Sequence, residues 1–309
     1  MANSALLAAL QRCISNPLAA PAFGSDAIAG IIGDAPSHYS KSPALWNAAF
    51  RRLGMNAVYL PFDVDDGHVG ELLALFKDSE RFLGVNVTVP HKVRVIDFLD
   101  DLDAGAQRIG AVNTVVRAAD GRLVGYNTDG EGFIESLLTP QPDRAGSFIP
   151  ALADRSVLLL GAGGSARAVA FHVAAMLRGG RLFISNRTFA QAQSLAGAVN
   201  ENCDHAAAIH EAEIPDYAPK VGLIVNSTTK GQGGMRRLTS GKVTSLEAYS
   251  ALAPANPPAF EESESGKAGL LSPETRALRA DIETNNDASM KLARSISPEV
   301  AFYDLIYHP

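Results

Sequence analysis

The sequence predicts a two-domain α/β protein built on mostly parallel sheets, and three observations lead to this class. The chain has 309 residues, more than one hydrophobic core usually organises, so two domains are expected. Short apolar segments alternate with helical segments, which is typical of βαβ units. Hydrophobic residues make up 47% of the chain and charged residues 19%, a composition typical of globular domains.

Charge and cysteine content argue against several functional classes. The net charge is −6 without a basic stripe, so nucleic acid is not expected as a partner. Cys13 and Cys203 have no metal-binding or disulfide spacing, and the histidines show no paired ligand spacing. We expect no metal, free thiols in a reducing compartment and hence a cytoplasmic protein. No apolar run has the length of a membrane span.

The first domain is expected at residues 27–138, after an N-terminal extension at 1–26. Leucines at helical spacing in that extension predict a short amphipathic helix; an organellar transit peptide is the alternative. Ala27–Asp34 is a continuous apolar run that predicts a buried strand. Ser42 is the expected N-cap of the following helix, with Pro43 at its first position and Gly54 at its end.

The rest of the first domain continues the alternation. Residues 57–64 and 84–90 predict strands, and 70–78 a helix between them. Two short strands joined by Asp120 and Gly121 predict a hairpin within 111–130.

The second domain is expected at residues 155–309, after a proline-rich linker at 139–154. Its sequence pattern predicts a strand, a glycine turn, a helix, a second strand and a second helix, followed by buried strands at 221–229 and 300–307. Residues 232–298 have no sustained period and form a long insertion, with helices expected at 245–252 and 273–282.

The glycine turn of the second domain carries a phosphate-binding pattern. Gly161, Gly163 and Ala166 have the G-x-G-x-x-[GA] spacing between an apolar strand and an apolar helix. The first glycine allows the tight turn, the second lets the backbone approach a pyrophosphate, and the small third residue lets the helix pack on the strand. This favours a Rossmann-like dinucleotide-binding domain over a turn that only packs tightly.

The end of the next strand indicates which dinucleotide binds. NAD sites place a carboxylate there for the ribose hydroxyls, whereas this chain has Asn186, Arg187 and Thr188. A guanidinium favours a 2′-phosphate, so we expect NADP, with NAD as the alternative. Arg187 as a solvated surface charge is the other interpretation.

Polar residues of the first domain follow successive strands, where open α/β sheets form ligand crevices. They are Ser40, Ser42, Asn86, Thr88, Lys92, Asn113, Asn127, Thr128 and Asp129. Asn86 and Thr88 are two residues apart and therefore lie on one face of their strand. The inventory suits a hydroxylated, uncharged or weakly anionic small molecule. The alternative is structural: Ser42 and Asp129 as helix caps, and Asn113 as a turn residue.

Lys92 and Asp129 are the candidate catalytic pair, because a lysine beside a carboxylate can exchange a proton with a reacting hydroxyl. The alternative is that Lys92 is a surface residue at the start of the helical segment that follows it. His91 could line the pocket, although such a residue is more often exposed.

These motifs together resemble the shikimate dehydrogenase family, which includes quinate dehydrogenases. The resemblance covers most of residues 27–309 and rests on "HYSKSP", "GVNVTVPHK", "GAVNT", "YNTDG", "GAGGSARAV", "NRT", "VNSTTKG" and "FYDLIYHP". It implies that Lys92 and Asp129 are catalytic and that NADP(H) interconverts 3-dehydroshikimate and shikimate on the route to chorismate and the aromatic amino acids.

The resemblance also implies a fuller set of site residues. The substrate would lie among Ser40, Ser42, Asn86, Thr88, Asn113 and Tyr307. The cofactor would contact Gly161, Ala162, Gly163, Gly164, Ser165, Ala166, Asn186, Arg187, Thr188, Asn226, Ser227 and Thr228.

The chain departs from the family pattern at four places. Trp46 stands where the family commonly has histidine, and Gln191 where a second basic residue often accompanies Arg187. The segment 232–298 is longer than the usual connection. Family members continue beyond the Tyr-x-Pro strand into two further helices, so a chain that stops at Pro309 is expected to be truncated or divergent.

Two alternatives to an NADP-dependent shikimate dehydrogenase follow. One is an NAD-preferring quinate or shikimate dehydrogenase, and the other a non-catalytic homologue that binds nucleotide or ligand. In each case we expect a small-molecule ligand, no nucleic-acid or membrane partner, and a monomer or homodimer.

Overall fold

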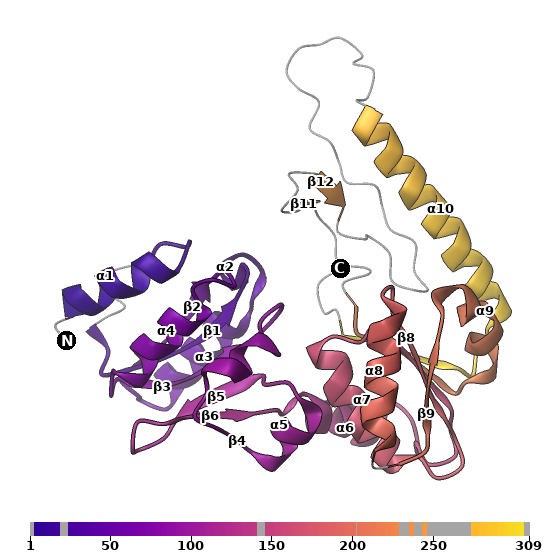
Figure 1. Ribbon diagram of the computed structural model, residues 1–309, viewed down its shortest axis with the longest axis horizontal. Helices are drawn as coiled ribbons and strands as arrows, with labels where there is room; N and C mark the ends of the chain where they lie inside the picture. Colours follow the sequence, from indigo (N-terminus) through magenta and orange to yellow (C-terminus); the bar gives the residue numbers. More distant parts are fainter. Residues whose placement is uncertain are drawn as a thin grey trace. The chain divides into compact units, whose positions relative to one another are not determined.

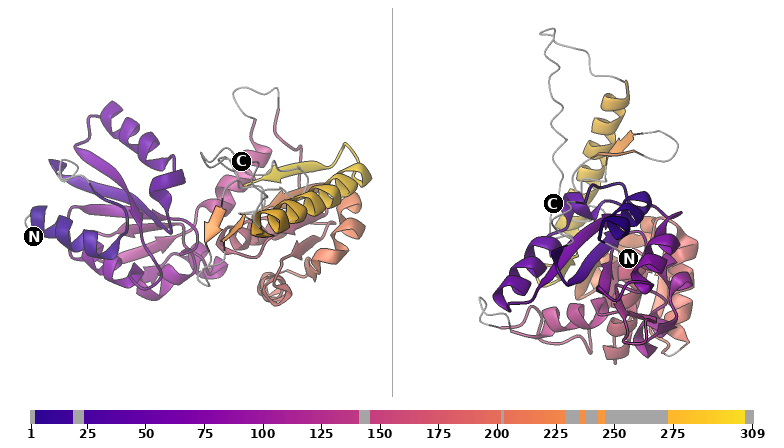
Figure 2. Two further views of the ribbon diagram at one scale, coloured as in Figure 1. Left: turned by 90° about the horizontal axis from the view of Figure 1, so that it is seen from above. Right: turned by 90° about the vertical axis from the view of Figure 1, so that its left-hand side faces the viewer.

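The computed structural model describes residues 3–18, 24–140, 146–201, 203–228, 235–237, 243–245 and 273–305. The chain forms two compact units, Met1–Phe133 and Ile134–Pro309, and each contains its own sheet (Figures 1 and 2). The division falls inside helix α6 (Asp129–Leu138), shortly before the predicted linker at 139–154. The two-domain α/β prediction is confirmed.

The sheet of the first unit has the strand order β2-β1-β3-β5-β6-β4. Its strands are β1 (Ala27–Gly33), β2 (Ala57–Asp63), β3 (Phe82–Val87), β4 (Asp101–Leu102), β5 (Thr114–Arg117) and β6 (Leu123–Tyr126). β1 is parallel to β2 and β3, whereas β5 runs antiparallel to β3 and β6. The predicted hairpin is therefore confirmed as β5–β6, and its antiparallel pairing brings the start of β5 beside the end of β3.

Helices of the first unit include three that the sequence predicts. They are α1 (Asn3–Cys13), α3 (Ser42–Arg52) and α4 (Val69–Lys77), and shorter helices are α2 (Pro36–Tyr39) and α5 (Ala104–Ile109). The predicted N-cap is wrong, because Ser42 lies within α3 and Lys41 takes the cap position without a side-chain bond. The segment after Lys92 forms only a short 3₁₀ helix, η2 (Arg94–Phe98), in place of a longer helix.

The core of the first unit includes the N-terminal extension. Leu6 and Leu10 of α1 are 1% and 0% exposed and lie in one apolar cluster with residues such as Phe62, Leu72 and Val85. These residues come from α1, β2, α4 and β3. The extension therefore belongs to the folded unit, as the helical leucine spacing predicts.

The second unit has a parallel sheet in the order β13-β10-β7-β8-β9. The strands are β7 (Val157–Leu160), β8 (Leu182–Ser185), β9 (Ala206–Ile209), β10 (Leu223–Asn226) and β13 (Ala301–Asp304). The first strand lies in the middle, with the next two on one side and the last two on the other. This is the doubly wound Rossmann order, which places a ligand crevice at the carboxyl edge between β7 and β10.

Helices of the second unit alternate with these strands. They include α7 (Gly164–Met176), α8 (Phe189–Asn200), α9 (Ile214–Tyr217) and α10 (Pro273–Ser295), the long yellow helix in Figure 1. Two short 3₁₀ helices, Glu211–Glu213 and Ala218–Lys220, flank α9. The helix predicted at 273–282 is confirmed, and it continues to Ser295.

Most of the predicted insertion at 232–298 lies outside the described residues. Its described parts are β11 (Met235–Arg237), β12 (Val243–Ser245) and α10. The helix expected at 245–252 falls almost entirely outside them. Within the described segments, none of the helices combines the length and apolar character needed to cross a bilayer.

Candidate active site

β3 presents a polar face at the carboxyl edge of the first sheet. Val85 and Val87 point into the core at 3% exposure each, whereas Asn86 and Thr88 are partly exposed. The strand alternates sides at every residue, which explains why these two polar side chains share one face. Beyond Thr88 the chain turns, and this turn carries Lys92.

Lys92 and Asp129 meet within the first unit. Lys92 Nζ donates to Asp129 Oδ2 at 2.6 Å, and the two side chains are 13% and 22% exposed. Partial burial strengthens this charge-assisted hydrogen bond relative to a surface pair. The structure therefore brings together the two residues that the sequence singles out for proton transfer.

Asp129 is held at the N-terminus of α6. Its backbone N–H donates to Asn127 Oδ1 at 3.0 Å, and Asn127 Nδ2 donates to the carbonyl of Ala111 at 2.9 Å. A carboxylate in the first turn is also stabilised by the helix dipole. Asp129 is the first residue of its helix, and its carboxylate binds Lys92 and Asn113.

Asn113 is the central residue of the polar network. Its Nδ2 donates to Asp129 Oδ1 at 2.7 Å and to Thr128 Oγ1 at 2.9 Å. Its Oδ1 accepts from Thr114 Oγ1 at 3.0 Å and from the backbone N–H of Thr128 at 3.1 Å. Asn113 therefore both holds the turn before α6 and orients the Asp129 carboxylate.

Ser40 and Ser42 lie at the junction between α2 and α3. Ser40 Oγ accepts from the backbone N–H of Ser42 at 3.2 Å. The Ser42 side chain hydrogen-bonds to the Tyr59 hydroxyl. Burial raises the pKa of Tyr59 above its usual value, and the Ser42 hydrogen bond opposes this increase.

Tyr59 and Thr114 also join the network, although neither is among the predicted site residues; Tyr59 lies outside the motifs, and Thr114 is the last residue of "GAVNT". Tyr59 OH donates to Asn86 Oδ1 at 2.6 Å, and Asn86 Nδ2 donates to Thr114 Oγ1 at 3.2 Å. Tyr59 lies within an apolar strand segment, so its sequence context indicates a core residue. The sequence holds one signal for Thr114, its position directly after Asn113.

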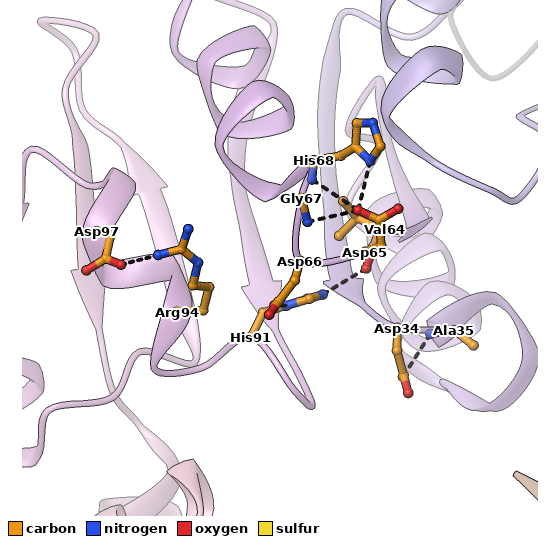
Figure 3. A network of polar contacts seen from close by, with 10 residues as sticks. All are labelled: Asp34, Ala35, Val64, Asp65, Asp66, Gly67, His68, His91, Arg94 and Asp97. Atoms are coloured by element: carbon orange, nitrogen blue, oxygen red, sulfur yellow. Dashed lines mark hydrogen bonds and ion pairs between the residues drawn. The ribbon is translucent and has the colours of Figure 1, made fainter. Parts of the chain in front are cut away.

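His91 is buried, which corrects the expectation of an exposed residue. Its side chain is 1% exposed; Nε2 donates to the carbonyl of Val64 at 2.8 Å, and Nδ1 faces Asp66 Oδ1 at 3.2 Å (Figure 3). Both partners follow β2 directly. The ring therefore connects the turn that carries Lys92, after β3, to the loop after β2, which lies on the other side of β1.

The loop of Asp66 carries further polar contacts. Asp65 Oδ1 accepts from the backbone N–H of Gly67 at 2.9 Å and contacts His68 Nδ1 at 2.8 Å (Figure 3). The hydrogen bond from His68 lowers the pKa of Asp65, and the same contact raises the pKa of His68. This loop is thus held in place beside His91.

The glycine turn of the second unit has the geometry that the pattern predicts. Gly161 has φ +112°, and a Cβ there would lie 2.5 Å from Ser227 Oγ, so only glycine fits. At Gly163, the N-cap of α7, a Cβ would meet no atom of the described residues within 4 Å. Ala166 is fully buried against the core. The open backbone at Gly163 and the helix N-terminus fit a pyrophosphate.

The other cofactor segments lie at the same edge of this sheet. Asn186 Nδ2 donates to Gln191 Oε1 at 2.9 Å and to the carbonyl of Thr188 at 3.0 Å, while Arg187 and Thr188 are exposed. Ser227 Oγ donates to the carbonyl of Leu160 at 2.7 Å, which fixes the loop after β10 beside the turn. Gln191, where the family often has a base, instead orients Asn186.

The Asn226 side chain shapes the loop after β10. Its Oδ1 accepts from the backbone N–H of Thr228 at 3.1 Å and from Thr228 Oγ1 at 2.7 Å. Its Nδ2 donates to the Asp304 carboxylate at 3.2 Å.

Tyr307, which is expected to contact the substrate, lies outside the described residues. Among the described residues, no group of three or more His, Cys, Asp or Glu is arranged to hold a metal ion.

Comparisons with known proteins show which family this chain resembles. Residues 31–115 match the family model for the shikimate dehydrogenase substrate-binding domain, and 143–247 that for shikimate / quinate 5-dehydrogenase. The chain is 41% identical over 202 residues to shikimate dehydrogenase (NADP(+)) of Shouchella clausii, covering 65% of this chain and 69% of the relative. For the Lysinibacillus sphaericus protein of that name, the identity is 39% over 232 residues, covering 72% and 78%.

Solved structures show the same relationship. Shikimate 5-dehydrogenase from Thermus thermophilus, in complex with NADP(H) and shikimate, is 35% identical with a TM-score of 0.55, over 66% of this chain and 69% of that chain. A 5-ketofructose reductase of Gluconobacter is 29% identical with a TM-score of 0.55, over 68% and 71%. The chain therefore belongs to the shikimate dehydrogenase family.

Proposed function

We propose that this protein is an NADP-dependent shikimate dehydrogenase that interconverts 3-dehydroshikimate and shikimate. The observation that carries the proposal is the hydrogen-bonded pair of Lys92 and Asp129, 2.6 Å apart within a partly buried polar network. The family relationship supports the substrate and the cofactor, since the curated relatives are named as NADP(+) shikimate dehydrogenases.

Lys92 donates the proton in the reduction and accepts it in the reverse reaction. Bound NADPH supplies the hydride that adds to the carbonyl carbon of 3-dehydroshikimate, and is oxidised to NADP+. The carbonyl oxygen then gains negative charge, which the Lys92 ammonium stabilises and protonates to give the hydroxyl. Asp129 holds the lysine toward this oxygen, and in the reverse reaction Lys92 accepts the hydroxyl proton.

Side chains at the carboxyl edge of the first sheet hold the substrate ring. In this assignment Ser40, Ser42, Asn86, Thr88 and Asn113 contact the substrate from this edge, and the family resemblance adds Tyr307, which lies outside the described residues. Their hydroxyl and amide groups both donate and accept hydrogen bonds, which suits a ring carrying several hydroxyls. Asn113 contacts Asp129 directly, and Asn86 is linked to Asn113 through Thr114.

Residues of the second unit bind the cofactor. The backbone of Gly161, Ala162, Gly163, Gly164, Ser165 and Ala166 binds the pyrophosphate at the start of α7. Asn186, Arg187 and Thr188 bind the 2′-phosphate, and Asn226, Ser227 and Thr228 line the nucleotide from the loop after β10. The proposal includes a cytoplasmic location, a role in aromatic amino acid biosynthesis, and a monomer or homodimer.

Turnover assays on four substrate and cofactor combinations test the proposal. Absorbance of reduced nicotinamide is followed with shikimate or quinate, each with NADP+ or NAD+. We expect the fastest turnover with shikimate and NADP+. A preference for NAD+ with either substrate would contradict the cofactor assignment, and a flat trace in all four would favour the non-catalytic ligand-binding homologue.

Lys92→Ala tests the catalytic assignment. Loss of the proton donor is expected to lower kcat by about 10²–10⁴-fold while NADP+ affinity is retained. Lys77→Ala is the matched control, because Lys77 is a 46% exposed lysine of the same unit that pairs with Asp100. Unchanged turnover in Lys92→Ala would show that another group carries the proton.

A further inference from the structure

We propose that Tyr59 and Thr114 are positioning residues of this active site. They orient Asn86 and Asn113 through a chain of hydrogen bonds that ends at Asp129, and thereby set the geometry of the substrate contacts and of the catalytic pair. The inference rests on the proposed function, since it concerns the same site.

The chain runs across four elements. Tyr59 in β2 donates to Asn86 in β3 at 2.6 Å, and Asn86 Nδ2 donates to Thr114 in β5 at 3.2 Å. Thr114 Oγ1 donates to Asn113 Oδ1 at 3.0 Å, and Asn113 Nδ2 donates to Asp129 Oδ1 at 2.7 Å. Asn86 and Thr114 are register partners in the antiparallel pair of β3 and β5, which explains their contact.

The ionised carboxylate at the end of the chain dictates the direction of every bond. Because Asp129 can only accept, Asn113 must direct its NH₂ group toward Asp129. Asn113 Oδ1 then faces two donors, the Thr128 backbone N–H and the Thr114 hydroxyl. With its proton used in this way, Thr114 accepts from Asn86 Nδ2, so Asn86 Oδ1 faces Tyr59.

Tyr59 is suited to be the first donor of this sequence. Its side chain is buried at 3% exposure, and burial raises the pKa of its hydroxyl, which therefore keeps its proton at neutral pH. Trp46 stacks on its ring at 6.0 Å, and Asn47 binds its backbone N–H and carbonyl. These contacts to the ring and to the backbone of Tyr59 hold its hydroxyl in position.

The two residues have different expected roles. Removing the Thr114 hydroxyl frees Asn113 Oδ1 from one donor and Asn86 Nδ2 from its acceptor, so the Asp129 carboxylate and Lys92 lose part of their alignment. Removing the Tyr59 hydroxyl frees Asn86 and Ser42, which contact substrate in the proposed assignment and not the reacting oxygen. Thr114 should therefore affect kcat, and Tyr59 should mainly affect KM.

Kinetics of Thr114→Val, Thr114→Ser and Tyr59→Phe test this proposal in the full-length protein. We expect about tenfold lower kcat in Thr114→Val, recovery in Thr114→Ser because the hydroxyl returns, and about tenfold higher KM for shikimate in Tyr59→Phe. Thr139→Val, the same chemical change at an exposed position of α6's C-terminal turn, is the control and should match the wild type. Wild-type kcat in Thr114→Val, or equal impairment in Thr114→Ser, would overturn the proposal.

A second measurement separates this inference from the proposed function. The side-chain amide NMR signals of Asn86 and Asn113 are recorded without substrate in the same variants. Tyr59→Phe should shift the Asn86 signals, and Thr114→Val the signals of both residues. If the wild type does not turn over shikimate, the proposed function fails, but these shifts still support the hydrogen-bond chain. Unshifted signals would overturn it whatever the activity.

Discussion

At the scale of single residues, one hydrogen-bond acceptor, the Asp129 carboxylate, determines how several neighbouring side chains are oriented. Asp129 can only accept hydrogen bonds, and this fixes the amide of Asn113 and, through Thr114, the amide of Asn86. Spacing alone places these residues on a common edge. It does not specify which atom of each amide faces which neighbour, since that depends on contacts between residues far apart in the chain.

We expect cofactor choice to depend on one exposed side chain, Arg187. In Arg187→Ala we expect the Kd for NADPH to rise by about 10–100-fold while that for NADH changes little, because only NADPH carries the phosphate that the guanidinium is proposed to bind. Fluorescence titration of both reduced cofactors measures this. Arg178→Ala is the control, since this exposed arginine precedes β8 and so lies at the opposite end of the strand. An equal loss for both cofactors would contradict the 2′-phosphate assignment.

At the scale of elements, the N-terminal extension completes the first unit. α1 packs on the core, and the segment after it protects the edge strand β2. Asn16 Oδ1 accepts from the backbone N–H of Asp63 at 2.8 Å, and Asn16 Nδ2 donates to the carbonyl of Pro61 at 3.1 Å. Asn47 makes the equivalent pair of bonds with Tyr59. Two asparagines thus occupy backbone groups that could otherwise pair with another strand.

Packing of α1 should contribute measurably to stability. Leu10→Ala removes a fully buried side chain, and we expect a loss of about 2–5 kcal/mol in the free energy of unfolding. Urea denaturation followed by circular dichroism measures it. Leu7→Ala, on the partly exposed side of the same helix, should cost less. Equal and small losses in both variants would show that α1 is not integral to the core.

At the scale of the whole molecule, the chemistry is divided between two folded units. The proton-transfer network belongs to Met1–Phe133, and the glycine turn with its neighbouring loops to Ile134–Pro309. The sheets differ accordingly. The second sheet follows the doubly wound order throughout. The first adds the antiparallel hairpin β5–β6, and Asn113 directly precedes β5 while Asn127 directly follows β6.

Acid stability of the molecule should depend on Asp100. The hydrogen bond from Lys77 lowers the pKa of the Asp100 carboxyl below its usual value. A depressed carboxyl pKa stabilises the folded state above the unfolded-state pKa, and this contribution is lost as the pH falls through the folded-state value. Asp100→Asn should therefore be less stable than the wild type at neutral pH, and the difference should shrink below pH 3.8.

Urea midpoints at about pH 7 and about pH 3 measure this difference. Asp78→Asn is the control, because Asp78 is exposed at the end of the same helix, α4. A difference between Asp100→Asn and the wild type that is as large in acid as at neutral pH would show that the ion pair does not set the acid limit.

The sequence predicts those features of the site that local pattern controls. Local sequence predicts three of these features: the buried strand before Asp34, the hairpin around Gly121 and the turn at Gly161. They can be predicted because hydrophobic periodicity and glycine placement act over a few residues. Local pattern was misleading at Ser42, whose hydroxyl binds Tyr59 rather than the start of its own helix.

By itself, then, the sequence determined the α/β class, the phosphate-binding turn and the residues available at the carboxyl edge of each sheet. Only the tertiary structure decided that Lys92 meets Asp129, that His91 is buried, and that Tyr59 and Thr114 belong to the polar network. The physical reason is that these contacts join positions separated by one or more strands. Their geometry follows from strand register and core packing, which no short window of sequence specifies.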